Sequence, residues 1–181
     1  MKKRILISLS ILSMLCASSL IAQEADEASG ISFDYIRGEG KVQGIKIAAQ
    51  VYVDWLEKYS ENAELYFESS VNIWEYSEQH RHDSNFVLAI SPVILYPLHQ
   101  FTNATLYGEL GIGISFLSDS NFAGKDVGSL YQFEDRLGLV VRYGLKRRHQ
   151  FSIRYFHYSN AGLSNPNPGL DFVSFSYGKL F

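Results

Sequence analysis

The sequence predicts an all-β protein: an eight-stranded antiparallel transmembrane β-barrel of the outer membrane, preceded by a cleaved signal peptide. Two observations lead to this fold class. Beyond residue 22, no stretch of 18 or more apolar residues offers a membrane-spanning helix. Apolar and polar residues instead alternate through most of the chain, and the strand formers Tyr and Phe occur twelve times each, which is typical of strands with two unlike faces.

Residues 1–22 have the composition of a secretory signal peptide. Three basic residues open the segment, an apolar run continues to about Cys16, and a cleavage site ends at Ala22. Serines within the apolar run and acidic residues directly after the segment argue against an uncleaved anchor helix. The bulky Leu15 before Cys16 argues against a lipoprotein signal. We therefore expect removal of 1–22, which leaves 23–181 as the barrel domain.

Cleavage after Ala22 would change the chemistry that the chain offers. The only cysteine leaves with the signal, so disulfide and thiol chemistry are excluded. Three of the sixteen Lys and Arg residues leave as well, so thirteen basic residues remain against nineteen acidic ones. The resulting net charge of −6 argues against a nucleic-acid partner.

Eight segments alternate and are expected to be the strands. They are 31–38, 43–55, 64–76, 85–96, 104–117, 130–143, 149–159 and 170–181. One face of these segments is almost purely aliphatic and aromatic, while the other carries charges of both signs. A soluble β-sandwich also alternates, but a charged interior with an apolar exterior indicates a barrel that closes in lipid. Asp135 is an unexplained exception on the apolar face.

The connections divide into short and long ones. We expect both termini in the periplasm. The short turns on the periplasmic side are then 56–63, 97–103 and 144–148. The loops on the outside of the cell are 39–42, 77–84, 118–129 and 160–169. The longest loop, 118–129, could overhang a site or be a mobile surface loop, and we favour the second interpretation. His80 and His82 are interpreted as part of a solvated loop, because no third metal ligand stands at a recognisable spacing.

Charges on the polar face are expected to neutralise one another inside the barrel. Arg142, Arg154, Glu68 and Glu134 are examples from different strands. Eight strands leave no open pore, so these side chains must fill the lumen.

The stretch 157–171 combines an imidazole, a hydroxyl and a carboxylate, the three groups of a Ser-His-acid hydrolase. His157 and Ser159 share one face of a strand end, because residues i and i+2 point the same way. Asp171 opens the next strand, from which it can reach His157 if the two strands are antiparallel. The segment between them is rich in Asn, Gly and Pro and predicts a loop. An incidental His and Ser in a hairpin is the alternative interpretation.

This run resembles the signature of the PagL family, the outer-membrane lipid A 3-O-deacylases. In that family a His-x-Ser-Asn group, a downstream Asn in a Pro/Gly loop and an acid twelve residues after the Ser form the site. His157, Ser159, Asn160, Asn167 and Asp171 stand at those spacings. The acid is usually Glu in the family, whereas this chain has the shorter Asp. The motif is specific but covers fifteen of 181 residues; the rest matches the family only as an eight-strand pattern.

The resemblance implies an outer-membrane esterase that removes an ester-linked 3-hydroxyacyl chain from the 3-O position of lipid A in lipopolysaccharide. Ser159 would attack the ester carbonyl, His157 would take its proton, and Asp171 would orient His157. His157 and Ser159 have the parity of the apolar residues of segment 149–159, so the site is expected on the lipid-facing side near the outer rim. The resemblance implies no metal and no cofactor.

The oxyanion of this reaction needs hydrogen-bond donors. We expect them to be backbone N–H groups of the turn Asn160-Ala161-Gly162, with Asn167 contributing directly or by shaping the loop.

Other functions stay open at this point. The chain could be a non-catalytic outer-membrane barrel with a structural or adhesin role, or a phospholipase-like esterase of the same surface. The expected partners are lipopolysaccharide and the outer membrane, and a homodimer is left open.

Overall fold

The computed structural model describes residues 29–78, 81–144 and 146–181. The predicted signal segment 1–22 and His80 lie outside the described residues. Within those residues, no helix is long and apolar enough to cross a membrane. The long strands are β1 (Ser29–Gly38), β2 (Val42–Val53), β3 (Glu64–Glu78), β4 (Arg81–Gln100), β5 (Ala104–Leu117), β8 (Tyr131–Tyr143), β9 (His149–Ser159) and β10 (Leu170–Leu180), and the short ones are β6 (Asn121–Phe122) and β7 (Lys125–Asp126).

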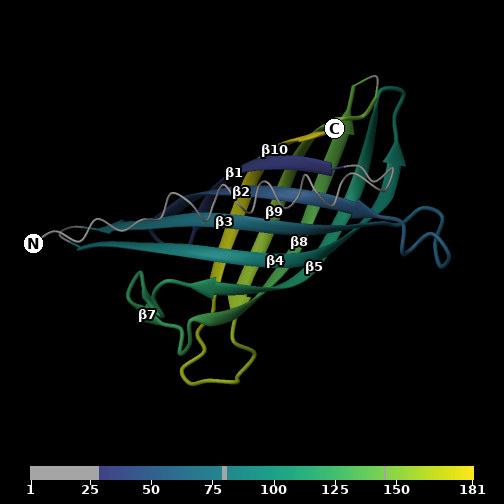
Figure 1. Cartoon of the computed structure of the whole chain (residues 1–181). Helices are drawn as coiled ribbons and strands as arrows, with labels where there is room; N and C mark the ends of the chain where they lie inside the picture. The colour runs from purple at the N-terminus through teal and green to yellow at the C-terminus, as the bar shows by residue number, and fades with distance from the viewer. Residues whose placement is uncertain (1–28, 79–80, 145) are drawn as a thin grey trace, which may run out of the picture.

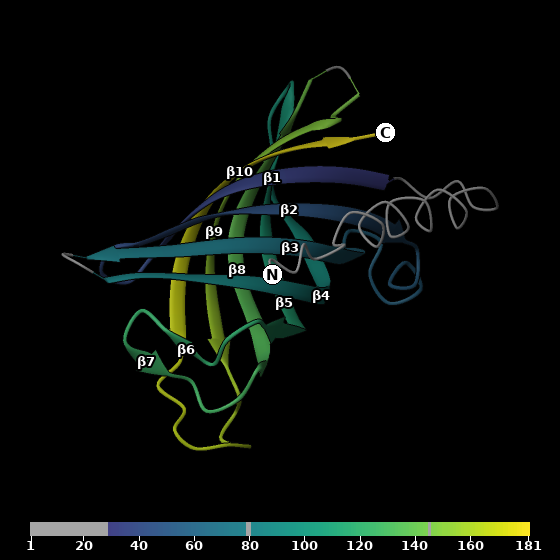
Figure 2. The ribbon, with the colours of Figure 1, turned by 60° about the vertical axis from the view of Figure 1, so that its left-hand side comes forward.

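The eight long strands form one closed barrel in the order β1-β10-β9-β8-β5-β4-β3-β2, with every neighbouring pair antiparallel (Figures 1 and 2). The first strand pairs with the last, with Gly30 opposite Leu180, so the sheet has no free edge. Closure satisfies the backbone hydrogen bonds that lipid cannot satisfy. The predicted eight-stranded antiparallel barrel is confirmed.

The strand β4 is longer than predicted at both ends. It begins at Arg81 and pairs with β3 as far as Glu78, so most of the predicted loop 77–84 is part of the ladder. At the other end it continues to Gln100, past a register shift between Pro97 and His99, and most of the predicted turn 97–103 is strand. Backbone pairing continues here although the alternation of apolar and polar residues has stopped.

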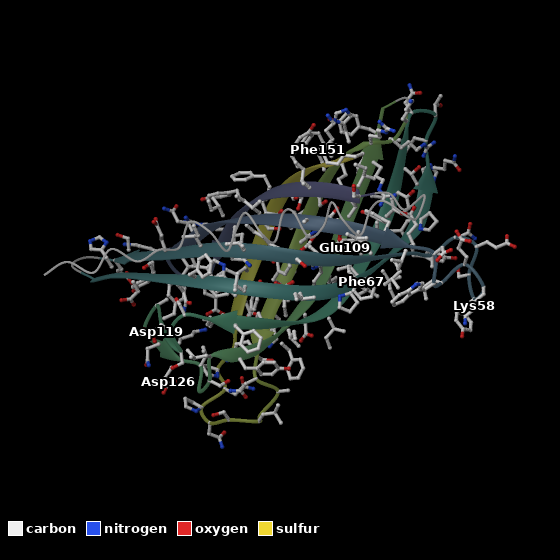
Figure 3. The ribbon with its side chains drawn as sticks, in the orientation of Figure 1. Lys58, Phe67, Glu109, Asp119, Asp126 and Phe151 are labelled. Carbon is white, nitrogen blue, oxygen red and sulfur yellow. The ribbon has the colours of Figure 1, made fainter. Side chains whose placement is uncertain are left out.

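The two faces of the barrel differ as the alternation predicts. In β9 the residues Gln150, Ser152 and Arg154 are buried, whereas Phe151, Ile153 and Tyr155 are exposed on the outer wall. In Figure 3 Phe151 projects outward. The same division recurs around the barrel, so its outer wall carries a belt of large apolar side chains. Such a belt is the surface that a transmembrane barrel presents to lipid.

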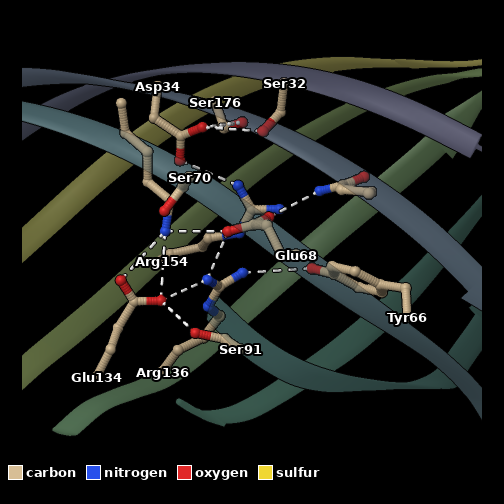
Figure 4. A network of polar contacts seen from close by, with 12 residues as sticks. Ser32, Asp34, Tyr66, Glu68, Ser70, Ser91, Glu134, Arg136, Arg154 and Ser176 are labelled. Carbon is tan, nitrogen blue, oxygen red and sulfur yellow. Dashed lines mark hydrogen bonds and ion pairs between the residues drawn. The ribbon is translucent and has the colours of Figure 1, made fainter. Parts of the chain in front are cut away.

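The lumen is filled by side chains that include paired charges (Figure 4). Arg136 Nη2 lies 2.6 Å from Glu68 Oε1 and 2.7 Å from Glu134 Oε1, and Lys46 Nζ lies 3.0 Å from Glu68 Oε1. Figure 4 shows Arg136 between Glu134 and Glu68. Buried charges of this kind are tolerated only when they are paired.

Two further arginines complete the pairing. Arg154 lies 2.7 Å from Glu109 and 3.1 Å from Asp34, and Arg142 lies 2.6 Å from Glu64. The expected neutralisation inside a filled lumen is therefore confirmed, with Glu64, Glu109 and Asp34 as additional partners.

The segment 118–129, predicted as a surface loop, has secondary structure of its own. It contains the hairpin β6–β7, whose turn residues Ala123 and Gly124 have positive φ angles of 52° and 81°, as in the tight turns that match strand twist. Phe122 and Val127 are fully buried in an apolar cluster with Trp74 at the outer end of the barrel. The hairpin is therefore anchored by its own apolar side chains.

Candidate active site

His157 and Asp171 form the centre of the candidate site. They are directly opposite each other in the ladder between β9 and β10, and His157 Nδ1 lies 2.7 Å from Asp171 Oδ1. Their side chains are 37% and 31% exposed, while the neighbours Phe156, Tyr158 and Phe172 are buried in the barrel. Both polar side chains therefore lie on the outer wall. The short Asp reaches the imidazole because the two residues face each other across adjacent strands.

The pairing with Asp171 orients the imidazole. When Nδ1 carries a proton it donates to the carboxylate, and Nε2 is left as a hydrogen-bond acceptor. Tyr155, two residues before His157 on the same face, also donates its hydroxyl to Asp171 Oδ1. Sequence reasoning missed Tyr155, although the i, i+2 spacing to His157 was a signal that could have found it. Asp171 thus accepts two hydrogen bonds that hold it in place.

Ser159 shares the outer face with His157 but is not yet in hydrogen-bond contact with it. Its side chain is partly buried, and within the described residues Ser159 Oγ has no hydrogen-bond partner. Catalytic hydrogen bonds are often long in the absence of substrate and tighten when substrate binds. The arrangement therefore has a preformed His–Asp pair with a free hydroxyl two residues further along the strand.

Gly169 has a specific role beside the imidazole. Its φ angle is +69°, and a Cβ atom at this position would lie 2.7 Å from His157 Cε1. Only glycine combines this backbone conformation with such a close approach at low cost. The Pro-Gly end of the loop thus makes room for the imidazole immediately before Leu170 begins the next strand.

Asn160 organises the loop that follows Ser159. Its buried side chain accepts hydrogen bonds from the Gly162 N–H at 2.9 Å and the Ser164 N–H at 3.4 Å, and its Nδ2 donates to the Val127 carbonyl at 2.9 Å. Its own N–H donates to Asn167 Oδ1 at 3.0 Å. These contacts give Asn160 a structural role in the loop.

The same bonds bear on the expected oxyanion donors. The N–H groups of Asn160 and Gly162 are both engaged inside the loop. Within the described residues, the N–H of Ala161 and the Nδ2 of Asn167 have no hydrogen-bond partner. Two donors of the predicted set are therefore available to a ligand, and two are occupied.

The segment that contains the hairpin β6–β7 packs against the loop that follows Ser159. The Ser164 hydroxyl donates to the Gly128 carbonyl at 2.7 Å, and Asn160 binds the preceding carbonyl of Val127. The approach is so close that a Cβ atom at Gly128 would lie 2.1 Å from the Pro166 carbonyl oxygen. Segment 118–129, for which overhanging a site was the less favoured expectation, therefore packs against the loop that follows Ser159.

Asp135, the exception on the apolar face, lies in the same row. Its ladder partner in β9 is His157, whose partner in β10 is Asp171. Three ionisable residues thus stand side by side on the outer wall of β8, β9 and β10. No hydrogen bond joins Asp135 to His157 within the described residues.

An apolar groove of about 350 Å³ lies on the outer wall beside this row. Its lining includes Leu137, Leu139, Ile153, Tyr155 and Val173, from the same three strands. It has the apolar surface that a hydrocarbon chain requires. Among the described residues, no group of three or more His, Cys, Asp or Glu is placed to hold a metal ion.

The closed barrel and its apolar belt define a small outer-membrane β-barrel protein, with a hydrolase-like group of side chains on its outer wall. Residues 43–179 match the family described as lipid A 3-O-deacylase (PagL). The match spans most of the chain, and the protein belongs to this family.

Individual relatives agree with this assignment. A lipid A deacylase PagL from Bordetella bronchiseptica is 42% identical over 81 residues, which are 45% of this chain and 44% of the relative. A protein of the same name from Pseudomonas aeruginosa is 29% identical over 114 residues, 62% of either chain. The chain therefore covers less than two thirds of the length of each. A crystal structure of the outer membrane enzyme PagL shares the fold, with a TM-score of 0.66 and 24% identity over 83% of this chain and 98% of that chain.

Proposed function

We propose that the protein is an outer-membrane serine esterase that removes an ester-linked 3-hydroxyacyl chain from the 3-O position of lipid A. The observation that carries the proposal is the His157–Asp171 pair, 2.7 Å apart on the outer wall, with the free hydroxyl of Ser159 two residues away. Membership of the lipid A 3-O-deacylase family and the names of both relatives support the substrate.

In the first half of the reaction Ser159 Oγ attacks the ester carbonyl while His157 Nε2 takes the hydroxyl proton. Asp171 keeps the proton of the imidazole on Nδ1 and stabilises the imidazolium that forms. The imidazolium then protonates the departing sugar oxygen, leaving the acyl chain on Ser159. In the second half His157 activates a water that releases the fatty acid.

The oxyanion of each tetrahedral intermediate needs donors that are not engaged elsewhere. Asn167 Nδ2 and the Ala161 N–H have no other partner in the described structure and are the donors we assign. Asn160 and Gly162 then act by fixing the loop that carries these two groups.

The position on the outer wall suits a lipid substrate. The ester of an outer-leaflet lipid lies near the membrane interface, at the end of β9 and the beginning of β10, and its acyl chain can enter the apolar groove below. A charge on the lipid face of a barrel costs about 2–4 kcal/mol at mid-bilayer but roughly 0–1 kcal/mol near the interface. A polar site is therefore tolerated at this level.

The test is mass spectrometry of lipid A from cells that produce the protein, the Ser159→Ala variant or neither. We expect loss of one 3-hydroxyacyl chain only with the unaltered protein. Unchanged lipid A in its presence, with the barrel folded in the outer membrane, would refute the proposal. A phospholipase-like activity would instead change the glycerophospholipids, and a non-catalytic barrel would change neither.

A further inference from the structure

A second cavity adjoins the candidate site on the other side of β10. This pocket of about 250 Å³ lies at the outer end of the barrel, between the turn after β1, the end of β3, the start of β10 and the hairpin β6–β7. The apolar groove is lined instead from β8, β9 and β10. Asp171, the partner of His157, lines the pocket, and Val173 on the same strand lines the groove. The pocket is therefore close enough to the candidate site to hold another part of a molecule whose ester lies at Ser159.

The lining of the pocket is divided by chemistry. Leu170 and Phe172 are buried and supply an apolar floor, whereas its rim carries Glu39, Glu78 and Lys125. Lys125 Nζ is paired with the Glu39 carboxylate, and it also donates to the Gly169 carbonyl at 3.3 Å. Glu39 is 52% exposed and Lys125 32%, so both are accessible to a ligand.

The charge balance of the pocket selects the chemistry of its occupant. With Asp171 included, the pocket has three carboxylates against two ammonium groups, because Lys125 pairs with Glu39 and Lys41 lies 3.7 Å from Glu78. This excess of negative charge disfavours a phosphate. Hydroxyl and amide groups fit better, because they donate to carboxylates and accept from lysine.

We propose that this pocket binds the hydroxyl and amide groups of the glucosamine head of the substrate while the acyl chain lies in the groove. The inference rests on the proposed function, since it names the part of lipid A that the same site recognises.

The test compares two substrates in detergent micelles: lipid A, and a p-nitrophenyl ester of a long-chain fatty acid, which has no sugar. For Glu39→Gln we expect the KM for lipid A to rise about tenfold with kcat nearly unchanged, because uniform binding is lost. The kinetics of the p-nitrophenyl ester should not change. Lys125→Gln should show the same selectivity. Matched controls are Glu61→Gln and Lys58→Gln, exposed residues of the turn between β2 and β3 at the opposite end of the barrel (Figure 3).

The outcomes separate the two proposals. An unchanged KM for lipid A in both rim variants would overturn the pocket assignment, and so would an equal defect with both substrates, which indicates a structural role. If the unaltered protein cleaves the p-nitrophenyl ester but not lipid A, the proposed function itself fails. A defect confined to lipid A supports the inference.

Discussion

This barrel has two polar clusters, one in the lumen and one on the outer wall, and they differ in how completely their polar groups are paired. In the lumen Lys46, Glu68, Glu134 and Arg136 have side chains at most 1% exposed, and their charges are paired with one another. In the outer-wall cluster His157 and Tyr155 are both hydrogen-bonded to Asp171, whereas Ser159 Oγ has no hydrogen-bond partner among the described residues. Breaking a buried charge pair destabilises a structure, whereas an exposed hydroxyl without a partner is available for chemistry.

Substitution of Ser159 or His157 should give the largest loss of activity, and it tests most directly whether the outer-wall cluster carries the chemistry. We expect Ala at either position to lower lipid A deacylation by about 10⁵-fold or more, because nucleophile and base act as a unit. Both variants should stay folded, since the side chains lie on the outer wall. The measurement is the rate in micelles, with a faster-running unheated band on a gel as the control for the barrel. Near-normal activity of folded Ser159→Ala would remove the nucleophile assignment.

Substitutions of Asp171 test whether its hydrogen bond to His157 matters for the reaction. Loss of an orienting carboxylate lowers rates by about 10⁴-fold when the imidazole takes the wrong tautomer, so Asp171→Asn should be strongly defective. Asp171→Glu should keep activity, consistent with the usual Glu of the family. The rates of both variants are to be measured under the same conditions.

Asp135 offers a matched control for Asp171 in the same row. Asp135 lies directly opposite His157 on β8, as Asp171 does on β10, but it makes no hydrogen bond to His157 in the described structure. Asp135→Asn should therefore lower the rate far less than Asp171→Asn. The reverse order would reassign the orienting acid to β8.

The row of Asp135, His157 and Asp171 also shows how far the sequence could go. The period of two predicts which face each residue occupies, and all eight strands were found in this way. The register between neighbouring strands cannot be predicted from the alternation within a single strand. Asp135 therefore remained an exception until its position opposite His157 was known.

Other differences have equally physical reasons. The pairing of Glu78 with Arg81 extends β3 and β4 beyond the residues whose alternation predicts a strand. Such an extension is possible because ladder hydrogen bonds need only backbone groups. The hairpin β6–β7 has two-residue strands, too short for any period to be recognised, although Phe122 and Val127 anchor it. The internal bonds of Asn160 depend on loop conformation, which Asn, Pro and Gly content alone does not specify.

Gly169 is expected to give an intermediate effect. In Gly169→Ala the new methyl would meet the imidazole, and the positive φ would be strained. We expect the rate to fall about 10–100-fold because a displaced imidazole loses its alignment with Ser159. Gly162→Ala is a useful control, since its φ is also positive at +76° but no atom lies within 4 Å of the added Cβ. Equal rates for both glycine variants would show that contact with His157 is unimportant.

The lumen cluster should give the smallest effect on the reaction and a clear effect on stability. Removing Arg136 leaves Glu68 and Glu134 with Lys46 as their remaining cation, and an uncompensated buried charge costs about 3–5 kcal/mol. Arg136→Met should therefore unfold at a lower denaturant concentration in micelles, while the folded protein keeps its kcat. The double variant with Glu134→Gln removes one charge of each sign and should regain much of the lost stability. If Arg136→Met instead lowered kcat of the folded protein as strongly as Asp171→Asn, the lumen would be part of the catalytic machinery, and the division between paired charges for stability and free groups for chemistry would fail.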